Sequence, residues 1–191
     1  MTTVISPFEY VTVLIAIILG MGITKIVSGL ASLVQNSEKV NVYWPHLILI
    51  VLVFILHIQE WWTTYDLINF KWRLPVFLFK ILYPVNLYVL ARLLFPTSFR
   101  TKFINLKEFY FNNFRRIYLL LIISAVLSLI DNTLIAGLAF RDQTFQFLVL
   151  SLFCFVAIRN SKNEIIHKVA ALILITASTI VLIITWNVFI I

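Results

Sequence analysis

The stretch Tyr43–Trp62, YWPHLILIVLVFILHIQEWW, indicates the class of the whole fold. It is twenty residues long and carries a single formal charge, Glu60, near its end. A helix of about 20 apolar residues matches the thickness of the hydrocarbon core of a bilayer. Inside lipid there is no water to bond to, and a helix satisfies all of its backbone hydrogen bonds within one segment. The stretch is therefore predicted to be a transmembrane helix.

Similar apolar runs fill most of the chain on both sides of this stretch. The sequence of 191 residues is 62% hydrophobic and its mean hydropathy is +1.02. We predict an all-α fold, a polytopic transmembrane helical bundle that forms a single domain over residues 1–191. Six spans are expected, but the fifth has only sixteen residues, so five spans is the alternative. The predicted spans are Glu9–Val34, Val42–Tyr65, Arg73–Phe95, Ile117–Phe140, Gln143–Ile158 and His167–Ile191.

Lysine and arginine are distributed unequally between the two sides of this predicted bundle. Nine of them lie in or beside the first, third and fifth connections, against three on the opposite side. The positive-inside rule then places these connections in the cytoplasm and both chain termini outside. This bias explains most of the net charge of +7, and no residues remain for a nucleic-acid-binding fold, so nucleic acid is not an expected partner. The nine are Lys39, Arg100, Lys102, Lys107, Arg115, Arg116, Arg159, Lys162 and Lys168, and the three are Lys71, Arg73 and Arg141.

The third connection has a helical pattern of its own over residues 97–116. Aromatic and aliphatic residues recur there at helical spacing, and basic residues point elsewhere. This pattern predicts an amphipathic helix on the cytoplasmic surface, with the bilayer and its anionic lipids as partners. A passive connector and a docking site for a cytoplasmic protein are the alternatives. The basic residues are Arg100, Lys102, Lys107, Arg115 and Arg116.

The first span carries small side chains at every fourth position. The row consists of Ala16, Gly20, Thr24 and Ser28, Thr12 and Ser32 extend it, and Gly22 and Gly29 widen it. Small residues let two membrane helices approach closely, so the row predicts a helix-packing interface. The partner helix belongs either to the same chain or to a second copy in a homo-oligomer.

Four ionisable residues are predicted to lie at a similar depth in three different spans. With about 1.5 Å of rise per residue, His57, Lys80 and Asp131 fall near one level and Glu60 about one turn further out. Charges at membrane depth are costly, so they should face the bundle interior and pair. They form either a structural ion pair or a site for a proton, an ion or a small solute. The polar residues Ser124, Ser128 and Asn132 accompany them on the fourth span.

Proline lies inside the third span, next to this predicted cluster. Pro84 has no N–H to donate to the carbonyl of Lys80, so a kink is expected there. Broken helices at membrane depth form binding sites in many transporters, but kinks are also common in ordinary membrane helices. The sequence leaves both interpretations open.

Motifs for catalysis or metal binding are absent from the sequence. There is no HExxH, no GxSxG and no glycine-rich phosphate loop, and the single cysteine, Cys154, excludes an intrachain disulfide and a CxxC site. His57 with Glu60 could act as a general base, but no nucleophile accompanies them. We therefore expect no enzyme, no cofactor and no metal.

Two stretches carry a resemblance to known proteins. SPFEYVTVLIAIILGMGIT at Ser6–Thr24 and the stretch Tyr43–Trp62 are similar to the amino-terminal half of small multi-pass bacterial membrane proteins of uncharacterised activity. The resemblance implies a bacterial inner membrane, and it transfers no functional residues.

The sequence leaves two candidate functions. One is a conduit or carrier for an ion, a proton or a small solute, and the other is a non-transporting membrane subunit or effector of a signalling or defence pair.

Overall fold

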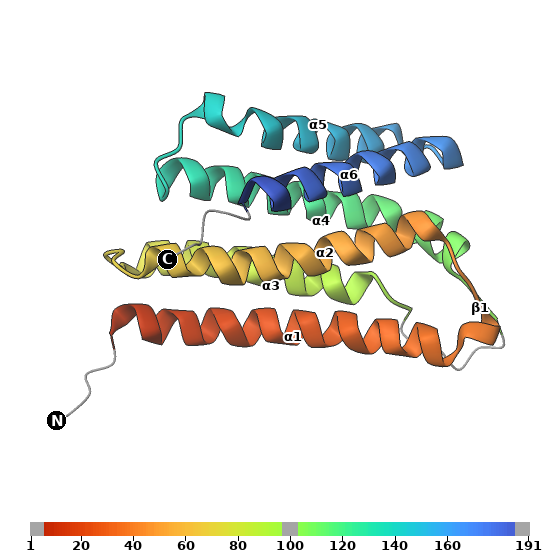
Figure 1. Ribbon diagram of the computed structural model, residues 1–191, viewed down its shortest axis with the longest axis horizontal. Coiled ribbons are helices and arrows are strands. Elements are labelled where there is room, and N and C mark those ends of the chain that lie inside the picture. The colour runs from red at the N-terminus through yellow and green to blue at the C-terminus, as the bar shows by residue number, and fades with distance from the viewer. Residues whose placement is uncertain (1–5, 97–102, 186–191) are drawn as a thin grey trace.

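The chain folds as a bundle of long helices (Figure 1). The computed structural model describes residues 6–96 and 103–185, with side chains up to residue 183. Within these ranges six helical segments are long and apolar enough to cross a membrane, which confirms the predicted all-α polytopic bundle. The helices are α1 (Pro7–Gln35), α2 (Trp44–Thr63), α3 (Leu74–Leu93), α4 (Leu106–Leu134), α5 (Thr144–Arg159) and α6 (Glu164–Thr185).

Local sequence signals set several helix ends. Ser6 Oγ accepts a hydrogen bond from the backbone of Glu9, whose carboxylate accepts one from the backbone of Ser6, and this capping box starts α1. Proline occupies the first turn of α1, α2 and α3, where its missing N–H is not needed. The fifth span reaches twenty residues because the short 3₁₀ helix η3 (Phe140–Gln143) precedes α5. The structure thus has six candidate spans rather than five in its described part.

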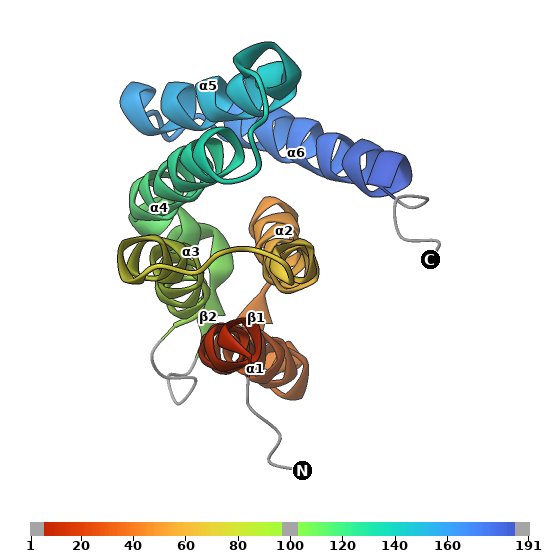
Figure 2. The same ribbon diagram turned by 90° about the vertical axis from the view of Figure 1, so that its left-hand side faces the viewer.

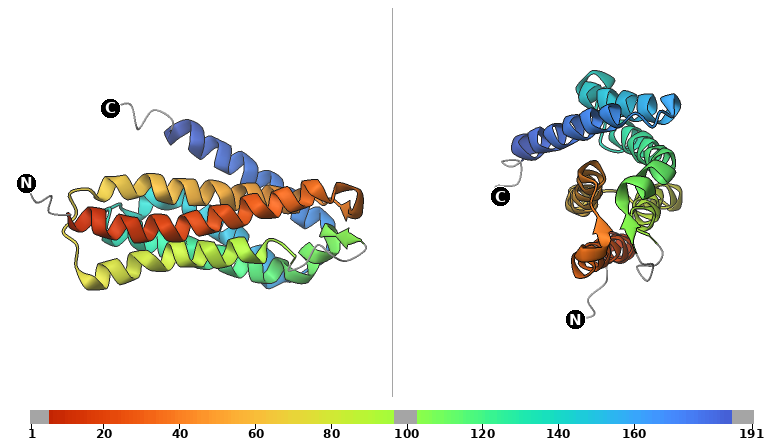
Figure 3. Two further views of the ribbon diagram at one scale, coloured as in Figure 1. Left: turned by 90° about the horizontal axis from the view of Figure 1, so that it is seen from below. Right: turned by 90° about the vertical axis from the view of Figure 1, so that its right-hand side faces the viewer.

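The helices are arranged in layers that are visible end on (Figure 2). Helix α1 lies against α2 and α3, α4 lies on the other side of α3, and α5 and α6 lie outermost. Helix α6 packs on α2 as well as on α5, and its C-terminal part diverges from the other helices (Figure 3).

A parallel bridge of two short strands joins the first and third connections. Strand β1 (Val40–Asn41) pairs with β2 (Ile104–Asn105), with Val40 opposite Ile104. Two further 3₁₀ turns, η1 (Ser37–Lys39) and η2 (Thr64–Leu67), follow α1 and α2. The bridge marks one end of the bundle, which we call the bridge end. The end where α2 and α4 finish and α3 and α5 begin is called the cavity end.

The third connection differs from the sequence-based expectation. From Leu106 onward the segment is the start of α4, a single helix of 29 residues, rather than a separate helix on the membrane surface. Its apolar residues Leu106, Tyr110 and Phe114 are buried inside the bundle. A helical apolar stripe has the same period whether it faces lipid or protein, so the pattern could not distinguish the two. Lys107, Arg115 and Arg116 are exposed, whereas Arg100 and Lys102 lie outside the described residues.

The packing face of α1 also differs from the prediction. Ala16, Thr24 and Ser28 are exposed, and a Cβ added at Gly20 would meet nothing within 4 Å. The buried face is a different one, formed by Val11, Ile15, Leu19, Gly22, Ile26, Gly29 and Leu33. Within the described part of the chain, the every-fourth-residue row from Ala16 to Ser28 is therefore not a packing interface. Close approach occurs instead at Gly22 and Gly29, where the rings of His57 and Phe95 occupy the space of a side chain.

Candidate functional site

The ionisable residues of α3 and α4 meet in the interior of the bundle. Lys80 Nζ donates to Asp131 Oδ2 at 2.9 Å, and the lysine is only 7% exposed. The predicted pairing of these two residues is therefore present. The second carboxylate oxygen, Asp131 Oδ1, is buried and has no hydrogen-bond partner within the described part of the chain. The ion pair leaves one acceptor of Asp131 unbonded and without exposed surface.

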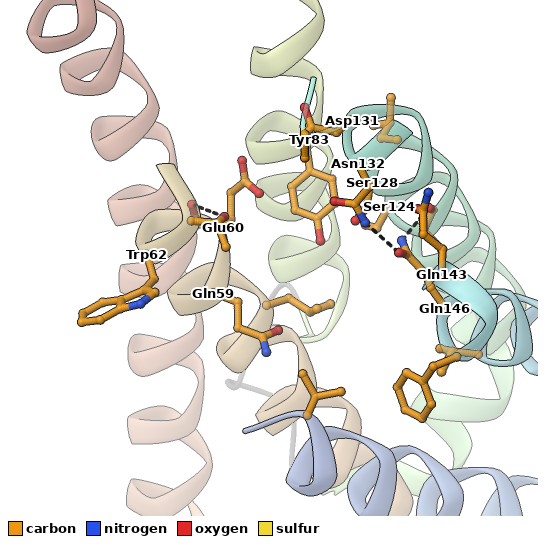
Figure 4. Close-up of a pocket in the computed structure, with 18 of the residues that line it drawn as sticks. Gln59, Glu60, Trp62, Tyr83, Ser124, Ser128, Asp131, Asn132, Gln143 and Gln146 are labelled. Atoms are coloured by element: carbon orange, nitrogen blue, oxygen red, sulfur yellow. Dashed lines mark hydrogen bonds between the residues drawn. The ribbon is translucent and has the colours of Figure 1, made fainter. Parts of the chain in front are cut away.

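A cavity of about 1020 Å³ surrounds this ion pair, and we call it the polar cavity. Helices α2, α3, α4, α5 and α6 all contribute to its wall, and Figure 4 shows its polar side chains. Part of its lining is apolar, with residues such as Leu56, Phe79, Leu127 and Val149. The polar lining residues are Gln59, Glu60, Lys80, Tyr83, Ser124, Ser128, Asp131, Asn132, Gln143 and Gln146.

Negative charge exceeds positive charge along this wall. The described lining residues include four acids, Glu60, Asp66, Asp131 and Asp142, and one cation, Lys80. No ion pair of Glu60 is found in the described ranges, although its side chain lies on the same cavity as Lys80. Asp66 and Asp142 are exposed, and Asp142 lies 3.7 Å from Arg141. The two acids that remain, Glu60 and Asp131, face one cation, Lys80. The electrostatic field inside the cavity therefore favours a positively charged guest.

Side-chain amides join α4 to α5 along one wall of the cavity. Asn132 Nδ2 donates to Gln146 Oε1 at 3.0 Å, and Gln146 Nε2 donates to the carbonyl of Ala125 at 3.2 Å. Gln143 Nε2 donates to Thr133 Oγ1 at 3.0 Å. Sequence analysis selected Asn132 but missed both glutamines. The sequence pattern could have predicted both glutamines, because two amides that lie three residues apart at the start of an apolar span share one helix face.

Ser124 and Ser128 lie on the cavity face of α4, as the polar stripe predicted. Ser124 Oγ accepts a hydrogen bond of 2.7 Å from Asn86 Nδ2, which also donates to the carbonyl of Leu120 at 2.9 Å. Asn86 therefore holds α3 against α4 just below the cavity. It follows Pro84, which lies inside α3 without ending the helix. The expected site at a broken helix is therefore a continuous helix with a proline beside an interhelical bond.

His57 does not belong to this site, which corrects the prediction. It is fully buried, its Nδ1–H donates to the carbonyl of Val53 at 2.7 Å, and its ring packs on Gly22 of α1. It is not among the residues that line the cavity, whereas Glu60 is. Residues three apart on a helix differ in direction by about 60°. This angle is enough to place Glu60 in the cavity and His57 at the α1–α2 contact.

Below the cavity the bundle is filled with buried side chains. Leu87 and Leu90 of α3, Ile50 of α2 and Ile117 of α4 have no exposed surface. Nearer the bridge end follows an aromatic cluster of Tyr43, His46, Tyr110, Phe114 and His167, with ring centroids such as Tyr43 and Tyr110 only 5.3 Å apart. The polar cavity is therefore closed toward the bridge end.

Histidine and tyrosine of the aromatic cluster are held mainly by neutral hydrogen bonds. His167 Nε2–H donates to the carbonyl of Ser161 at 2.8 Å, so Nδ1 accepts from Tyr110 Oη at 2.7 Å. His46 Nε2–H donates to the carbonyl of Leu94 at 2.8 Å. Burial raises the pKa of Tyr43 to about 12, so its hydroxyl stays neutral at ordinary pH. This cluster packs the bundle and offers no charged site.

The described part of the chain contains no group of three or more His, Cys, Asp or Glu placed to hold a metal ion. Comparisons with protein-family models, with curated proteins and with solved structures gave no match to this chain. Functional inference therefore depends on the residues of the polar cavity.

Proposed function

We propose that this multi-pass membrane protein binds a small solute in the polar cavity and acts as a carrier for it. The observation that supports the proposal is the cavity of about 1020 Å³, in which Glu60 lies beside the Lys80–Asp131 ion pair and has no ion pair of its own among the described residues. Such a volume exceeds that of a bare ion and lies in the range of small-molecule pockets. Charged groups at membrane depth are costly, and a purely structural pair needs neither the cavity nor a further acid.

A carrier agrees better with the geometry than an open conduit does. An ion or proton pathway needs polar groups or water along its whole length. The polar lining of the cavity ends at Ser124, which bonds to Asn86 behind it, and the fully buried Leu87 and Leu90 follow. A solute bound in the cavity would reach the other side only after the helices rearrange, which is the behaviour of carriers.

Charge bias gives the proposed orientation. The connections at the bridge end carry most of the lysine and arginine, so we place that end in the cytoplasm and the cavity end outside, in a bacterial inner membrane. A reporter that is active only in the periplasm should work when fused after Ile191 and be silent when inserted at Asn105. The reverse pattern would overturn the orientation.

Cysteine labelling tests whether the cavity is open to solutes. In a Cys154→Ala background, Ser128→Cys places a thiol in the cavity, and Ser151→Cys places a matched thiol on the exposed face of α5. A membrane-impermeant methanethiosulfonate reagent should label Ser128→Cys from the outside only and should leave Ser151→Cys, which is expected to face lipid, unlabelled. Labelling of Ser128→Cys from both sides would favour a conduit. If neither side labels it, the cavity is closed to solutes and the carrier proposal fails.

A non-transporting membrane subunit is the second candidate, and the outer face of α1 favours it. Ala16, Thr24 and Ser28 are exposed there, and nothing in the described part of the chain packs on Gly20. Exposed small residues suit contact with a second copy. Gly20→Leu should then separate the oligomer in a lipid nanodisc without unfolding the monomer, because the added side chain meets no neighbour. A wild-type chain that is monomeric by mass photometry would remove this candidate.

A further inference from the structure

The unpartnered polar atoms on the cavity wall are hydrogen-bond acceptors. Gln143 is 4% exposed and lines the cavity, and its Oε1 has no partner in the described ranges. Asp131 Oδ1 is likewise buried without a partner. Glu60 adds a carboxylate that no lysine or arginine pairs in these ranges. Glu60 thus offers a carboxylate to whatever occupies the cavity, and the buried oxygens of Asp131 and Gln143 reach a guest once their side chains rotate toward it.

Several donors on the same wall bond within the protein. Lys80 Nζ is bonded to Asp131, Asn132 Nδ2 to Gln146, and Gln146 Nε2 to the carbonyl of Ala125. The hydroxyls of Ser128 and Tyr83 also line the cavity, and no hydrogen bond of theirs is found in the described residues. The charge of the wall therefore decides the class of guest. An anion would meet an excess of negative charge, whereas a guest with a positive charge and N–H groups would pair with the carboxylate of Glu60.

The apolar and aromatic parts of the wall define the rest of the guest. Tyr83 lines the cavity from α3, one turn after Lys80, and its ring can face a cation (Figure 4). Leu56, Phe79 and Leu127 provide a surface for a hydrocarbon portion. The cavity therefore has a charged, acceptor-rich part and an apolar part side by side.

We propose that the ligand of the polar cavity is an amphiphilic ammonium compound, with N–H donors on the head and an apolar body. This inference rests on the proposed function, because it names the solute class of the same cavity. The ammonium group contacts Glu60, Asp131 and Gln143, and the apolar body lies along the leucine and phenylalanine side. A free amine and the ethanolamine headgroup of a bilayer lipid share this chemistry.

Four probes with the same hydrocarbon chain separate the contributions. Octylammonium has charge and N–H donors, octyltrimethylammonium has charge alone, octanol has a donor alone, and octanoate has the opposite charge. Each is added to the full chain carrying Ser128→Cys and Cys154→Ala in phosphatidylcholine nanodiscs, and its protection of the thiol from methanethiosulfonate is measured. Octylammonium should protect at a concentration about tenfold lower than octyltrimethylammonium, and octanoate should protect least.

Variants of single acids identify the contact. Glu60→Gln should weaken protection by octylammonium about tenfold and leave protection by octanol unchanged, because only the charge of the side chain is lost. Glu60 makes no ion pair within the described residues, so this substitution leaves the Lys80–Asp131 pair in place. Glu38→Gln, at an exposed position in η1, is the matched control and should change nothing. Gln143→Leu should also weaken octylammonium selectively.

Nanodisc lipids distinguish the two sources. If the natural ligand is a lipid headgroup, replacing phosphatidylcholine by phosphatidylethanolamine should protect the thiol without added probe. If it is a free amine, both lipids should leave the thiol reactive until octylammonium is added. Equal protection by all four probes, or protection that Glu60→Gln does not change, would overturn the ammonium class while leaving the cavity as a binding site. A thiol that reacts freely but is protected by no probe and by neither lipid would also overturn it. If Ser128→Cys never reacts in either lipid, the proposed function fails first.

Discussion

Both ends of the bundle bury polar side chains, but these side chains have different partners at the two ends. At the bridge end, Tyr110 and His167 bond to each other inside an aromatic cluster, and Lys107 pairs with Glu164 near the surface at 2.7 Å. At the cavity end, Lys80 and Asp131 form an ion pair in the interior, beside a large cavity and Glu60, which has no ion pair in the described residues. Buried polar groups normally find partners. Both ends keep buried polar atoms without one in the described residues, such as His46 Nδ1 at the bridge end and Asp131 Oδ1 at the cavity end. The cavity end adds a carboxylate and a large cavity, which makes it the stronger candidate for binding.

The largest expected effect comes from breaking the Lys80–Asp131 ion pair at the cavity end. Lys80→Met should lower the free energy of unfolding by about 3–5 kcal/mol, because it leaves the carboxylate of Asp131 without its cation. The double variant Lys80→Met with Asp131→Asn should recover much of this loss. Unfolding in a mixed detergent, followed by tryptophan fluorescence, measures both. Lys71→Met, at an exposed position, is the control, and additive effects of the two single variants would contradict the pair.

The next prediction compares leucines from the packed and the open parts of the bundle. Leu90→Ala removes a fully buried side chain and should cost about 3 kcal/mol. Leu127→Ala, on the cavity wall, should cost about 1 kcal/mol, because it only enlarges a space that is already present. Unfolding in mixed detergent, followed by tryptophan fluorescence, measures the loss of stability in each variant. Equal losses of stability would mean that the residues around the polar cavity are packed as tightly as the fully buried residues next to it.

A smaller effect is expected from removing single hydroxyl groups. Tyr110→Phe should cost about 1–3 kcal/mol, because the buried Nδ1 of His167 loses its partner. Tyr83→Phe should change stability by less than about 0.5 kcal/mol, since no hydrogen bond of its hydroxyl is found in the described residues and its ring remains. Thermal unfolding of the two variants in the same nanodisc gives the comparison. A larger loss of stability for Tyr83→Phe than for Tyr110→Phe would mean that the hydroxyl of Tyr83, and not that of Tyr110, makes the stronger hydrogen bond.

The smallest effect concerns the exposed charges of the bridge end. Arg115→Gln with Arg116→Gln should change the free energy of unfolding by less than about 0.5 kcal/mol, because both side chains are exposed. The same double variant should reduce capture of anionic phospholipid by the detergent-solubilised protein, and the reduction should fade at high salt. Lipid mass spectrometry of the purified protein measures this. Unchanged lipid content would show that these charges serve topology alone.

Sequence analysis succeeded where one helix at a time was sufficient. Span number follows from apolar length, and the pairing of Lys80 with Asp131 follows from depth, because charges inside a membrane must meet a partner. Rotation about each helix axis was harder to predict. His57 and Glu60 point to different neighbours, and the small-residue row of α1 lies opposite the face that packs. The rotation of a helix about its own axis depends on the helices that pack against it, so the sequence of one helix does not predict it.

The sequence by itself determined the class of the fold, the approximate ends of the helices and the depth of the charged residues, because apolar length and helical rise are local properties. Only the tertiary structure decided which faces meet. It placed Gly22 and Gly29, rather than Gly20, at the close contacts, and it made the apolar stripe of Tyr110 and Phe114 part of the core. It also formed the polar cavity, because residues of α2, α3, α4, α5 and α6 line it together.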